Sequence, residues 1–598
     1  MTGPSDGDDG ITRRTLLERA GTTSMAALLG AALSDAALAT PVEPDDLGTG
    51  PSPSFDESTA SKQVFPESVA SGDPTTSGAV VWTRVDPDVY TPDQPLILQV
   101  ARDEAITDVV ENYWVDPDEL GPEHDFTVKV DLDGELSPAS TYYYRFVYDG
   151  TSSRTGRFRT LPPADETPDS VRLAVLACQD FRAGFYGTFR YVAEADVDYM
   201  LHLGDFIYEW MGGSHYDDRW IIIPSEEWTA MGLRDYRALY RRYRSDPYLR
   251  RALERHALIA TWDDHEIVNN RYWSYEEGRP YAGPGDHPKN DDAAFMRQLF
   301  ADGIQAWVEY LPVRVRYDPD ADRVIDQLEL WRSFRFGDLV DLVVTDERLF
   351  RSGPGADVGF GARTETTRQP PDETRTMLGD EQREWFLDRV ADDGTTWTAW
   401  ANEVLHMAFD TSGALGSFYN PDAWDGFEYE RRRIDTHLRE HDVDNFVTLT
   451  GDMHTTLAGY VQTAYGPDAD GDRVGVEFMT PAVTSPNLKE TLDLPGGASY
   501  EAAVQREVLD SNPHLEFFNS HHWGYSVVEF TPDACTFSVY AVDKTVPAPQ
   551  ADRELLKRFR VPEGDVVIED VTDEAEGAWD DGRQALVAVR RIRFRWGR

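Results

Sequence analysis

The chain has 598 residues, and its 108 Asp and Glu against 57 Lys and Arg give a formal net charge of −51. Proteins that bind nucleic acids present basic surfaces to the phosphates, so this balance predicts no stable nucleic-acid partner. Because 40% of the residues are hydrophobic and 12% aromatic, the composition predicts a packed protein of roughly two to five domains. Only 6 residues are lysines. An acidic, lysine-poor chain suits concentrated salt, where self-repulsion is screened, and we interpret the charge as halophilic.

The first 40 residues predict a twin-arginine signal peptide. Residues 12–17 read TRRTLL, residues 21–39 are small and apolar, and Ala37-Leu38-Ala39 is a candidate cleavage site. We therefore expect export by the twin-arginine machinery to an extracellular or cell-surface location. The apolar stretch is too weakly hydrophobic for a stable span, so no transmembrane span is expected in the mature chain. Residues 41–63, rich in Pro, Asp and Ser, predict a disordered linker.

The remaining chain divides by pattern. Residues 64–162 hold short alternating segments between turn signals, which predicts a small all-β sandwich domain. Residues 171–545 alternate buried-strand runs with helical stretches, which predicts an α/β catalytic domain. Residues 546–598 form a C-terminal extension of uncertain structure, whose basic end suggests a late strand on an acidic surface, with a partner-binding or lipid-touching role as the alternative.

Polar clusters directly follow six of the predicted strands. Because ligands bind beyond the carboxyl ends of strands in α/β sheets, we expect these clusters to converge. The two cysteines either pair with each other or leave Cys178, at a strand end, as a ligand. The clusters are Cys178-Gln179-Asp180, Gly204 to Glu209, Asp263-Asp264-His265-Glu266, Asp346-Glu347-Arg348, Asn402-Glu403 and Gly451-Asp452-Met453-His454.

The ligand types indicate two kinds of metal. Thiolate and phenolate favour ferric iron, imidazole suits iron or zinc, and carboxylate oxygens suit calcium or another hard cation. Such a pair polarises a phosphoryl oxygen and activates a water as hydroxide. His265 either hydrogen-bonds the phosphoryl group or, when protonated, protonates the leaving oxygen.

These motifs resemble the PhoD-type alkaline phosphatases of the metallophosphoesterase superfamily. The resemblance rests on Gly-Asp-x-x-Tyr, Asp-Asp-His-Glu and Gly-Asp-x-His in this order, and on further segments along the chain. Those segments are SVASGDP at 68–74, VWTR at 81–84, YRSDP at 243–247 and WDGF at 424–427. Phe206 stands where many relatives carry Tyr, a difference expected to change packing and not chemistry.

The resemblance implies a calcineurin-like domain of two stacked mixed β-sheets flanked by helices, preceded by the β-sandwich. It also implies a secreted phosphatase or phosphodiesterase that acts on small phosphoesters or polymeric phosphodiesters through a metal-activated hydroxide at an Fe³⁺ and Ca²⁺ cluster. His265 would face the phosphate, Arg348 and Asn402 would hold phosphate oxygens or metal, and Asp263 could share calcium ligation. The implied metal ligands are Cys178, Asp205, Tyr208 and His454 for iron, with Asp205 bridging, and Asp264 and Asp452 for the second metal.

Two alternatives stay open at this point. The same fold could hold two divalent ions such as manganese or zinc. A catalytically idle calcium-binding surface protein is the other alternative, and the intact Cys178, Tyr208, His265 and His454 argue against it because a scaffold needs neither thiolate nor phenolate.

Overall fold

The computed structural model describes residues 41–55, 61–213, 219–353, 372–392, 394–410, 420–466, 471–493 and 495–574. The predicted signal peptide and the basic C-terminal end lie outside these residues. Among the helices described, none is both long and apolar enough to cross a membrane.

The N-terminal strands belong to two sheets. One is a six-stranded sheet in the order β1-β5-β4-β7-β8, with β9 also paired to β7. Its strands are β1 (Gly48–Thr49), β4 (Leu96–Ala101), β5 (Val109–Val115), β7 (Thr141–Tyr148), β8 (Thr151–Ser152) and β9 (Gly156–Arg159). Residues 41–55 reach both sheets: Gly48 pairs with Trp114 of the six-stranded sheet, and Val42 bridges Val130 of the other one. The prediction of a disordered linker was therefore wrong for these residues, because strand pairing fixes a segment that composition alone marks as unfolded.

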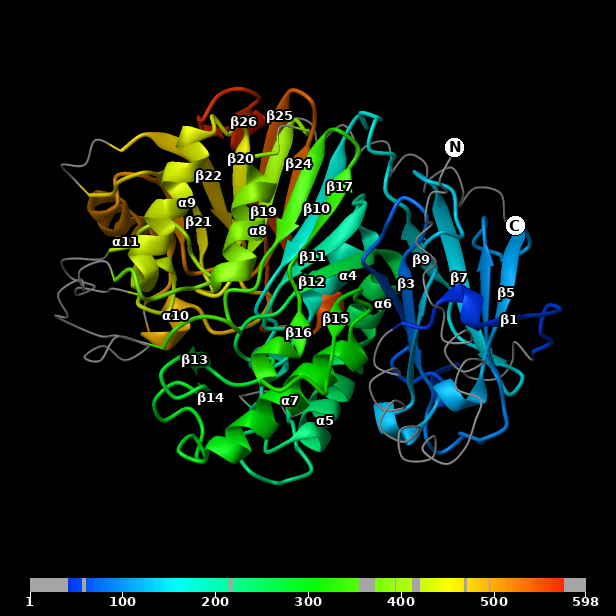
Figure 1. The fold of residues 1–598 in the computed structure, drawn as a ribbon. Helices are drawn as coiled ribbons and strands as arrows, with labels where there is room; N and C mark the ends of the chain where they lie inside the picture. The colour runs from blue at the N-terminus through cyan, green and yellow to red at the C-terminus, as the bar shows by residue number, and fades with distance from the viewer. Residues whose placement is uncertain are drawn as a thin grey trace, which may run out of the picture.

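The other N-terminal strands join the main sheet of the molecule (Figure 1). Gly72, at the end of β2, pairs with Leu258 of β12 in parallel. A Cβ on Gly72 would lie 2.5 Å from the Leu258 carbonyl oxygen, so this close approach requires glycine. The strands of residues 64–162, predicted as a small β-sandwich, thus lie in two sheets, and one of these continues into the catalytic region. The three strands are β2 (Val69–Gly72), β3 (Val80–Arg84) and β6 (Thr127–Asp131).

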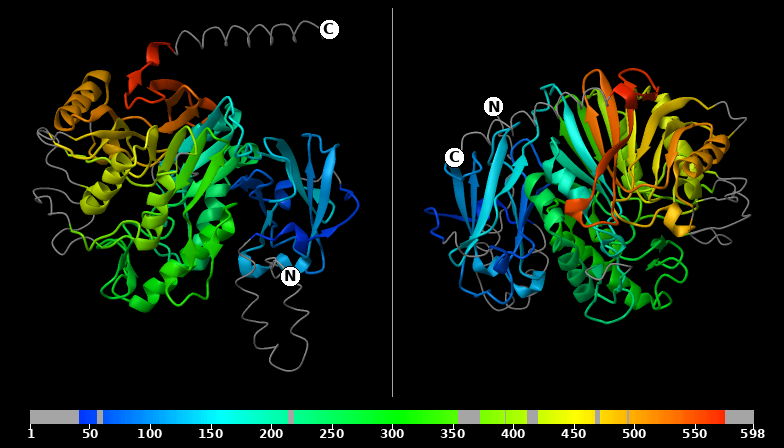
Figure 2. Two further views of the ribbon diagram at one scale, coloured as in Figure 1. Left: turned by 45° about the horizontal axis from the view of Figure 1, so that its top comes forward. Right: turned by 180° about the vertical axis from the view of Figure 1, so that it is seen from behind.

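The main sheet has ten strands in the order β27-β26-β25-β24-β10-β11-β12-β2-β3-β6. Strands β10, β11 and β12 run parallel at its centre, and β24 pairs antiparallel with β10. Part of the predicted C-terminal extension belongs to this sheet, where β26 lies beside β25 (Figure 2, right). The strands not yet bounded are β10 (Val171–Leu176), β11 (Tyr199–Leu203), β12 (Ala257–Thr261), β24 (Gly524–Phe530), β25 (Ala534–Val542), β26 (Arg553–Pro562) and β27 (Glu569–Asp570).

A second mixed sheet of seven strands faces the first. Its order is β17-β18-β19-β20-β22-β21-β23. Phe478 of this sheet stacks on Phe537 of the ten-stranded sheet with ring centroids 4.5 Å apart, and Tyr199 meets Phe336 at 5.2 Å. The buried faces of the two sheets thus form the core. The strands are β17 (Arg332–Phe336), β18 (Val340–Val344), β19 (Trp397–Asn402), β20 (Phe446–Thr450), β21 (Thr456–Gln462), β22 (Arg473–Met479) and β23 (Leu515–Asn519).

Helices flank the two sheets (Figure 1). Helices α5 and α6 follow each other between β11 and β12. The last turn of α5 carries arginines. The N-cap residue of α6, Asp246, accepts a hydrogen bond from the amide of Tyr248. The helices are α4 (Gly187–Glu194), α5 (Leu233–Arg244), α6 (Pro247–Arg255), α7 (Ala293–Tyr310), α8 (Asp380–Val390), α9 (Glu428–Glu440), α10 (Leu488–Thr491) and α11 (Ala498–Ser511). This arrangement bears out the predicted mixed sheets with helices.

Candidate metal centre

The carboxyl ends of four parallel strands meet at one place. Cys178 follows β10, Asp205 follows β11, Asp264 follows β12 and Asp452 follows β20 of the other sheet. The amide of Cys178 donates to the carbonyl oxygen of Gly204 at 3.1 Å, which joins the first two ends. A Cβ on Gly451 would lie 2.9 Å from the Cβ of Ala177, so glycine lets β20 approach the first sheet. Clusters far apart in sequence therefore converge, as the strand-end argument predicts.

The backbone is strained at these positions. Cys178, Asp205, Asp452 and His454 all have left-handed φ angles, between 52° and 66°. A non-glycine residue pays about 1–3 kcal/mol to hold such a conformation, and it persists only where the surroundings fix it. These four strained residues lie in one cluster, so the surrounding fold fixes the directions of their side chains.

The first group of ligand atoms belongs to Cys178, Asp205 and His454, which lie within 4.8 Å of one another. The Tyr208 hydroxyl donates to Asp205 Oδ2 at 2.6 Å and lies 3.2 Å from His454 Nε2. His454 Nδ1 lies 2.7 Å from the carbonyl oxygen of Pro486, and donation to that oxygen leaves Nε2 as the atom that faces the cluster. Thiol, carboxyl, phenol and imidazole thus meet as predicted.

The second group comprises Asp205, Asp264 and His265, again within 4.8 Å. Asp205 is common to both groups, which is the position required of a bridging ligand. His265 Nδ1 lies 2.7 Å from Glu209 Oε2, and its Nε2 lies 3.9 Å from Asp264 Oδ1. The imidazole is therefore held from behind by Glu209, with Nε2 toward the cluster.

Arg348 is fully buried among the carboxylates. It donates to Asp263 through Nε, to Asp422 through Nη1 at 2.8 Å and to Asp452 through Nη2 at 2.9 Å. Because each of its nitrogens is held by an aspartate, Arg348 organises the acidic groups here. The prediction that it holds phosphate oxygens is not supported by this geometry.

Asn402 is buried away from the cluster. Its side-chain amide donates to the carbonyl oxygen of Val404, and its Oδ1 accepts from Trp424 Nε1 at 3.1 Å. Both ends of the amide are thus used in packing the loop that follows β19. The predicted phosphate or metal contact of Asn402 is corrected to a structural role.

The electrostatics of the cluster call for a cation. Burial and the charges of Asp205 and Asp263 raise the pKa of the Cys178 thiol, and burial, against the opposing charge of Arg348, raises the pKa of Asp452 to about 7. Burial would also raise the pKa of Asp264, but the charges of Arg348 and His265 and the hydrogen bond from the Asn270 amide together hold that pKa below its usual value.

Two buried carboxylate oxygens of the cluster, Asp205 Oδ1 and Asp263 Oδ2, have no hydrogen-bond partner. An unpaired buried carboxylate oxygen is costly unless a cation compensates it. The donor set of thiol, phenol, imidazole and carboxylates supplies both the soft and the hard ligands that two metal ions would use. The residues therefore fit the two-metal centre that the motifs imply.

Sequence reasoning assigned no role to two residues of this centre. Glu209 lies four positions after Asp205 in the same loop, and Asp422 contacts Arg348 and lies 2.7 Å from Arg351 Nη1. Glu209 carried a usable signal, since an acidic residue just after the Gly-Asp-x-x-Tyr motif lies close to the metal ligands. No sequence signal marked Asp422, because the arginines that it contacts lie more than 70 positions away.

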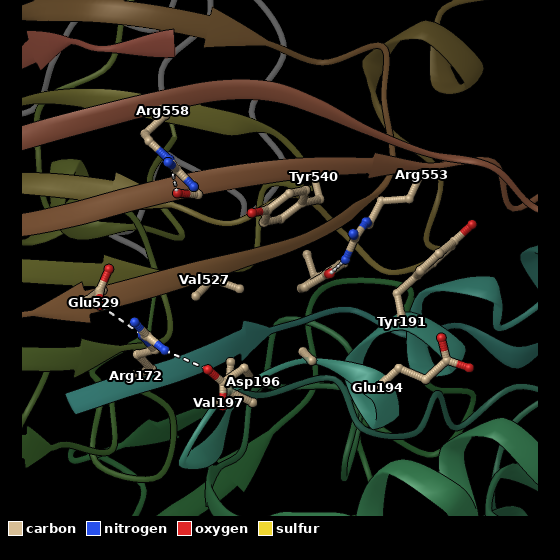
Figure 3. A pocket seen from close by; sticks show the side chains of 13 residues that line it. Arg172, Tyr191, Glu194, Asp196, Val197, Val527, Glu529, Tyr540, Arg553 and Arg558 are labelled. Carbon is tan, nitrogen blue, oxygen red and sulfur yellow. Dashed lines mark hydrogen bonds and ion pairs between the residues drawn. The ribbon is translucent and has the colours of Figure 1, made fainter. Parts of the chain in front are cut away.

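A cavity of about 510 Å³ lies elsewhere, over β10, β24, β25 and β26 beside the end of α4 (Figure 3). It contains no predicted site residue. Arg172 in this cavity pairs with Glu529 at 2.7 Å and with Asp196 at 2.8 Å. The chemistry of the predicted site therefore lies at the strand ends and not in this cavity.

The comparisons with known proteins agree with this geometry. A model of the PhoD-like phosphatase family matches residues 173–539, and a model of the PhoD-like phosphatase N-terminal domain matches residues 50–162. The chain is 29% identical over 478 residues to alkaline phosphatase D of Bacillus subtilis (strain 168), which covers 79% of this chain and 76% of that relative. It is also similar to a solved structure described as the structure of PhoD, with 25% identity, a TM-score of 0.71, and coverage of 86% of this chain and 93% of that one.

Proposed function

Because the chain belongs to the PhoD-like phosphatase family and is a phosphoric ester hydrolase, we propose that its substrates are hydrolysed at the two-metal centre bridged by Asp205. The observation that carries this proposal is the pair of ligand groups that share Asp205. A shared carboxylate holds two ions at the short separation that in-line phosphoryl displacement uses.

The ligand types support ferric iron in the first group. Cys178, Tyr208 and His454 would hold it together with Asp205, because thiolate and phenolate stabilise Fe³⁺. Asp264 and Asp452 would hold calcium with the other side of Asp205. When bound, the two ions polarise the phosphoryl group and lower the pKa of a water at the centre. A pair of divalent ions, manganese or zinc, is the competing proposal. Manganese makes little use of the Cys178 thiolate, whereas zinc binds thiolate well, so metal analysis separates zinc from iron.

Side chains of the protein would donate the proton and orient the groups around the phosphate. Glu209 accepts the hydrogen bond of His265 Nδ1–H, which fixes the ring and leaves Nε2 toward the cluster. A proton on Nε2 is then placed to donate to a phosphoryl oxygen or to the leaving oxygen. Arg348 keeps Asp263 and Asp452 apart from each other and in place. Burial of these residues keeps bulk water from screening the interactions.

Export and salt adaptation belong to the same proposal. The TRRTLL segment and the net charge of −51 support a protein secreted by the twin-arginine route into a saline medium. Its substrates there would be extracellular monoesters or diesters of phosphate.

The test combines metal analysis of the purified chain with hydrolysis of a chromogenic phosphate monoester and diester at several salt concentrations. We expect iron and calcium, a Tyr-to-ferric charge-transfer band and turnover that rises with salt. Manganese or zinc in place of iron would favour the divalent alternative. A chain that holds calcium and hydrolyses neither ester in high salt would instead be the idle surface protein.

A further inference from the structure

A short ribbon leads directly away from the metal centre. It begins after Tyr208 and has three short segments: residues 209–212 in the middle, residues 220–222 along one edge and residues 228–230 along the other. The bridges Gly212↔Ile221 and Trp210↔Thr229 pair each flanking segment antiparallel with the middle one. The amide of Met211 also donates to the carbonyl oxygen of Trp228 at 2.9 Å. The middle segment is therefore held between the two flanking segments.

The bridges place Ile221 opposite Gly212 and Thr229 opposite Trp210. Because side chains alternate along extended backbone, the neighbours of Ile221 and Thr229 lie on the face turned away from Trp210, and the ribbon has two faces. The inner face carries Trp210, whose ring lies 4.6 Å from that of His265, together with the buried Ile221 and Ile223. The outer face carries Trp220, Ile222 and Trp228, which are 52%, 70% and 46% exposed. We call these three residues the apolar outer face.

The ring of Trp220 lies across the backbone of the ribbon. A Cβ on Gly213 would meet Trp220 Cε3 at 2.6 Å, so the glycine makes room for the indole. Trp220 is therefore packed against the ribbon with one side of its ring exposed, and it does not project freely into solvent. Elsewhere among the described residues, the exposed large hydrophobic side chains are Tyr275, Tyr429, Leu492 and Val567, on other segments of the fold.

The size of this face distinguishes between partners. Three half-exposed large side chains present roughly 300 Å² of apolar surface, within the range of functional patches on monomers. A stable protein–protein interface covers about 800 Å² on each partner, so this face is too small to hold a second copy by itself. Tryptophan is enriched where proteins meet the boundary between lipid headgroups and acyl chains, because its ring is apolar and its N–H is polar.

The charge of the surroundings restricts the kind of lipid. Glu226 and Glu227 are exposed in the connection between the two flanking segments, and the whole chain carries −51. These charges repel an anionic bilayer in dilute salt. Attraction must then come from burial of the apolar side chains, which salt strengthens and does not screen.

We propose that the apolar outer face docks on the surface of a zwitterionic lipid bilayer and so brings the metal centre, which lies behind the ribbon, to that surface. The side chains of Trp220, Ile222 and Trp228 insert among the headgroups, as the anchors of peripheral proteins do. No catalytic step depends on this contact.

The test is cosedimentation of the full chain with phosphatidylcholine vesicles in dilute and in molar salt, read together with the emission maximum of the tryptophans. The test variant is Trp220→Ser/Ile222→Ser/Trp228→Ser. The matched control is Leu492→Ser/Val567→Ser, which removes exposed apolar side chains of 42% and 43% exposure outside the ribbon. Thermal melting followed by circular dichroism establishes that each variant is folded.

We expect the wild type to bind in molar salt with a blue shift of its emission, the triple variant to lose at least ~10-fold in partition coefficient, and the control to stay within about twofold. Three results would each overturn the proposal: no binding by the wild type, equal binding by the triple variant, or tighter binding to vesicles that contain anionic lipid. A wild-type dimer that the triple variant makes monomeric would also overturn it, because the face would then be an interface between copies. The assay does not measure hydrolysis, so its failure leaves the phosphatase function untouched.

Discussion

Glu209 Oε2 lies 2.7 Å from His265 Nδ1; both side chains are buried, and the imidazole lies beside Asp205 and Asp264. The other oxygen of Glu209 accepts from the amide of Asn269 at 3.0 Å, so the carboxylate is fixed at both ends. The imidazole therefore has one orientation available, with Nε2 toward Asp264.

Removing this support should lower turnover more than substrate binding. We expect Glu209→Gln to reduce kcat by about 10–100-fold, because partners behind a catalytic histidine contribute about that much, with KM changed less than threefold. His265→Ala should cost at least as much, and the double variant should be no worse than His265→Ala alone. Steady-state kinetics of the three variants checks this, with metal content as the control. Additive losses would mean that Glu209 acts independently of His265.

The Cys178 side chain separates the ferric assignment from a manganese pair, because manganese makes little use of a sulfur ligand. Under the ferric assignment Cys178→Ser should lose at least ~10-fold in activity and in iron content. Tyr208→Phe should abolish the charge-transfer band, because the phenolate is the donor of that transition. Absorption spectra and metal analysis of the two variants provide the measurement. A Cys178→Ser enzyme with full activity would favour a manganese pair.

Arg348 holds three aspartates at once, and its loss should be costly for both stability and metal binding. Breaking a buried ion pair by removing one partner destabilises a protein by about 3–5 kcal/mol. We therefore expect Arg348→Met to unfold at lower denaturant concentration when metal-free, and to bind the second metal more weakly. Denaturant melts with and without calcium test this. Arg383→Met, whose partner Asp380 is exposed, serves as the control and should change stability little.

Lys129 gives a prediction that does not involve the site. Burial lowers the pKa of this lysine to about 7, and its amine donates to the carbonyl oxygen of Val308 at 2.7 Å. A folded pKa below the unfolded value penalises the native state fully below pH 7, and the penalty disappears as the pH rises toward about 10.5. The unfolding free energy of the wild type should therefore rise, relative to that of Lys129→Met, between pH 7 and 10. Paired denaturant melts across this range measure the difference, and a difference that is flat with pH contradicts the account.

Strand-end reasoning anticipated that the side chains of the centre converge because it depends on a property of parallel sheets, and their roles stay predictions. Cys178 and Asp205 follow neighbouring parallel strands, whose carboxyl ends lie at one edge of the sheet. His454 joins them from the other sheet, where Gly451 lets β20 approach Ala177. Asn402 fits the same pattern and lies outside the centre, since its amide is turned toward Trp424 and Val404 by the packing of a later loop. Position at a strand end does not determine the direction of a side chain.

The position of a residue at a strand end could not predict the role of Arg348 or the pairing of the N-terminal strands with the main sheet. The three aspartates around Arg348 come from segments 74 to 104 positions away, and no local pattern encodes such contacts. The link between β2 and β12 consists of one backbone pair at Gly72, which leaves no periodic signal. Residues 41–55 have the composition of a linker, and only their pairing with β5 gives them structure.

We propose that Asp205 bridges two metal ions and that hydrolysis requires both. The decisive measurement is metal stoichiometry together with turnover of a phosphate ester, on the wild type and on Asp205→Asn in the same salt. We expect about one ion of each kind per wild-type chain, with both ions and at least ~100-fold of the turnover lost in the variant. Unchanged metal content in Asp205→Asn, or full turnover by a wild type stripped of metal, would rule the bridging role out.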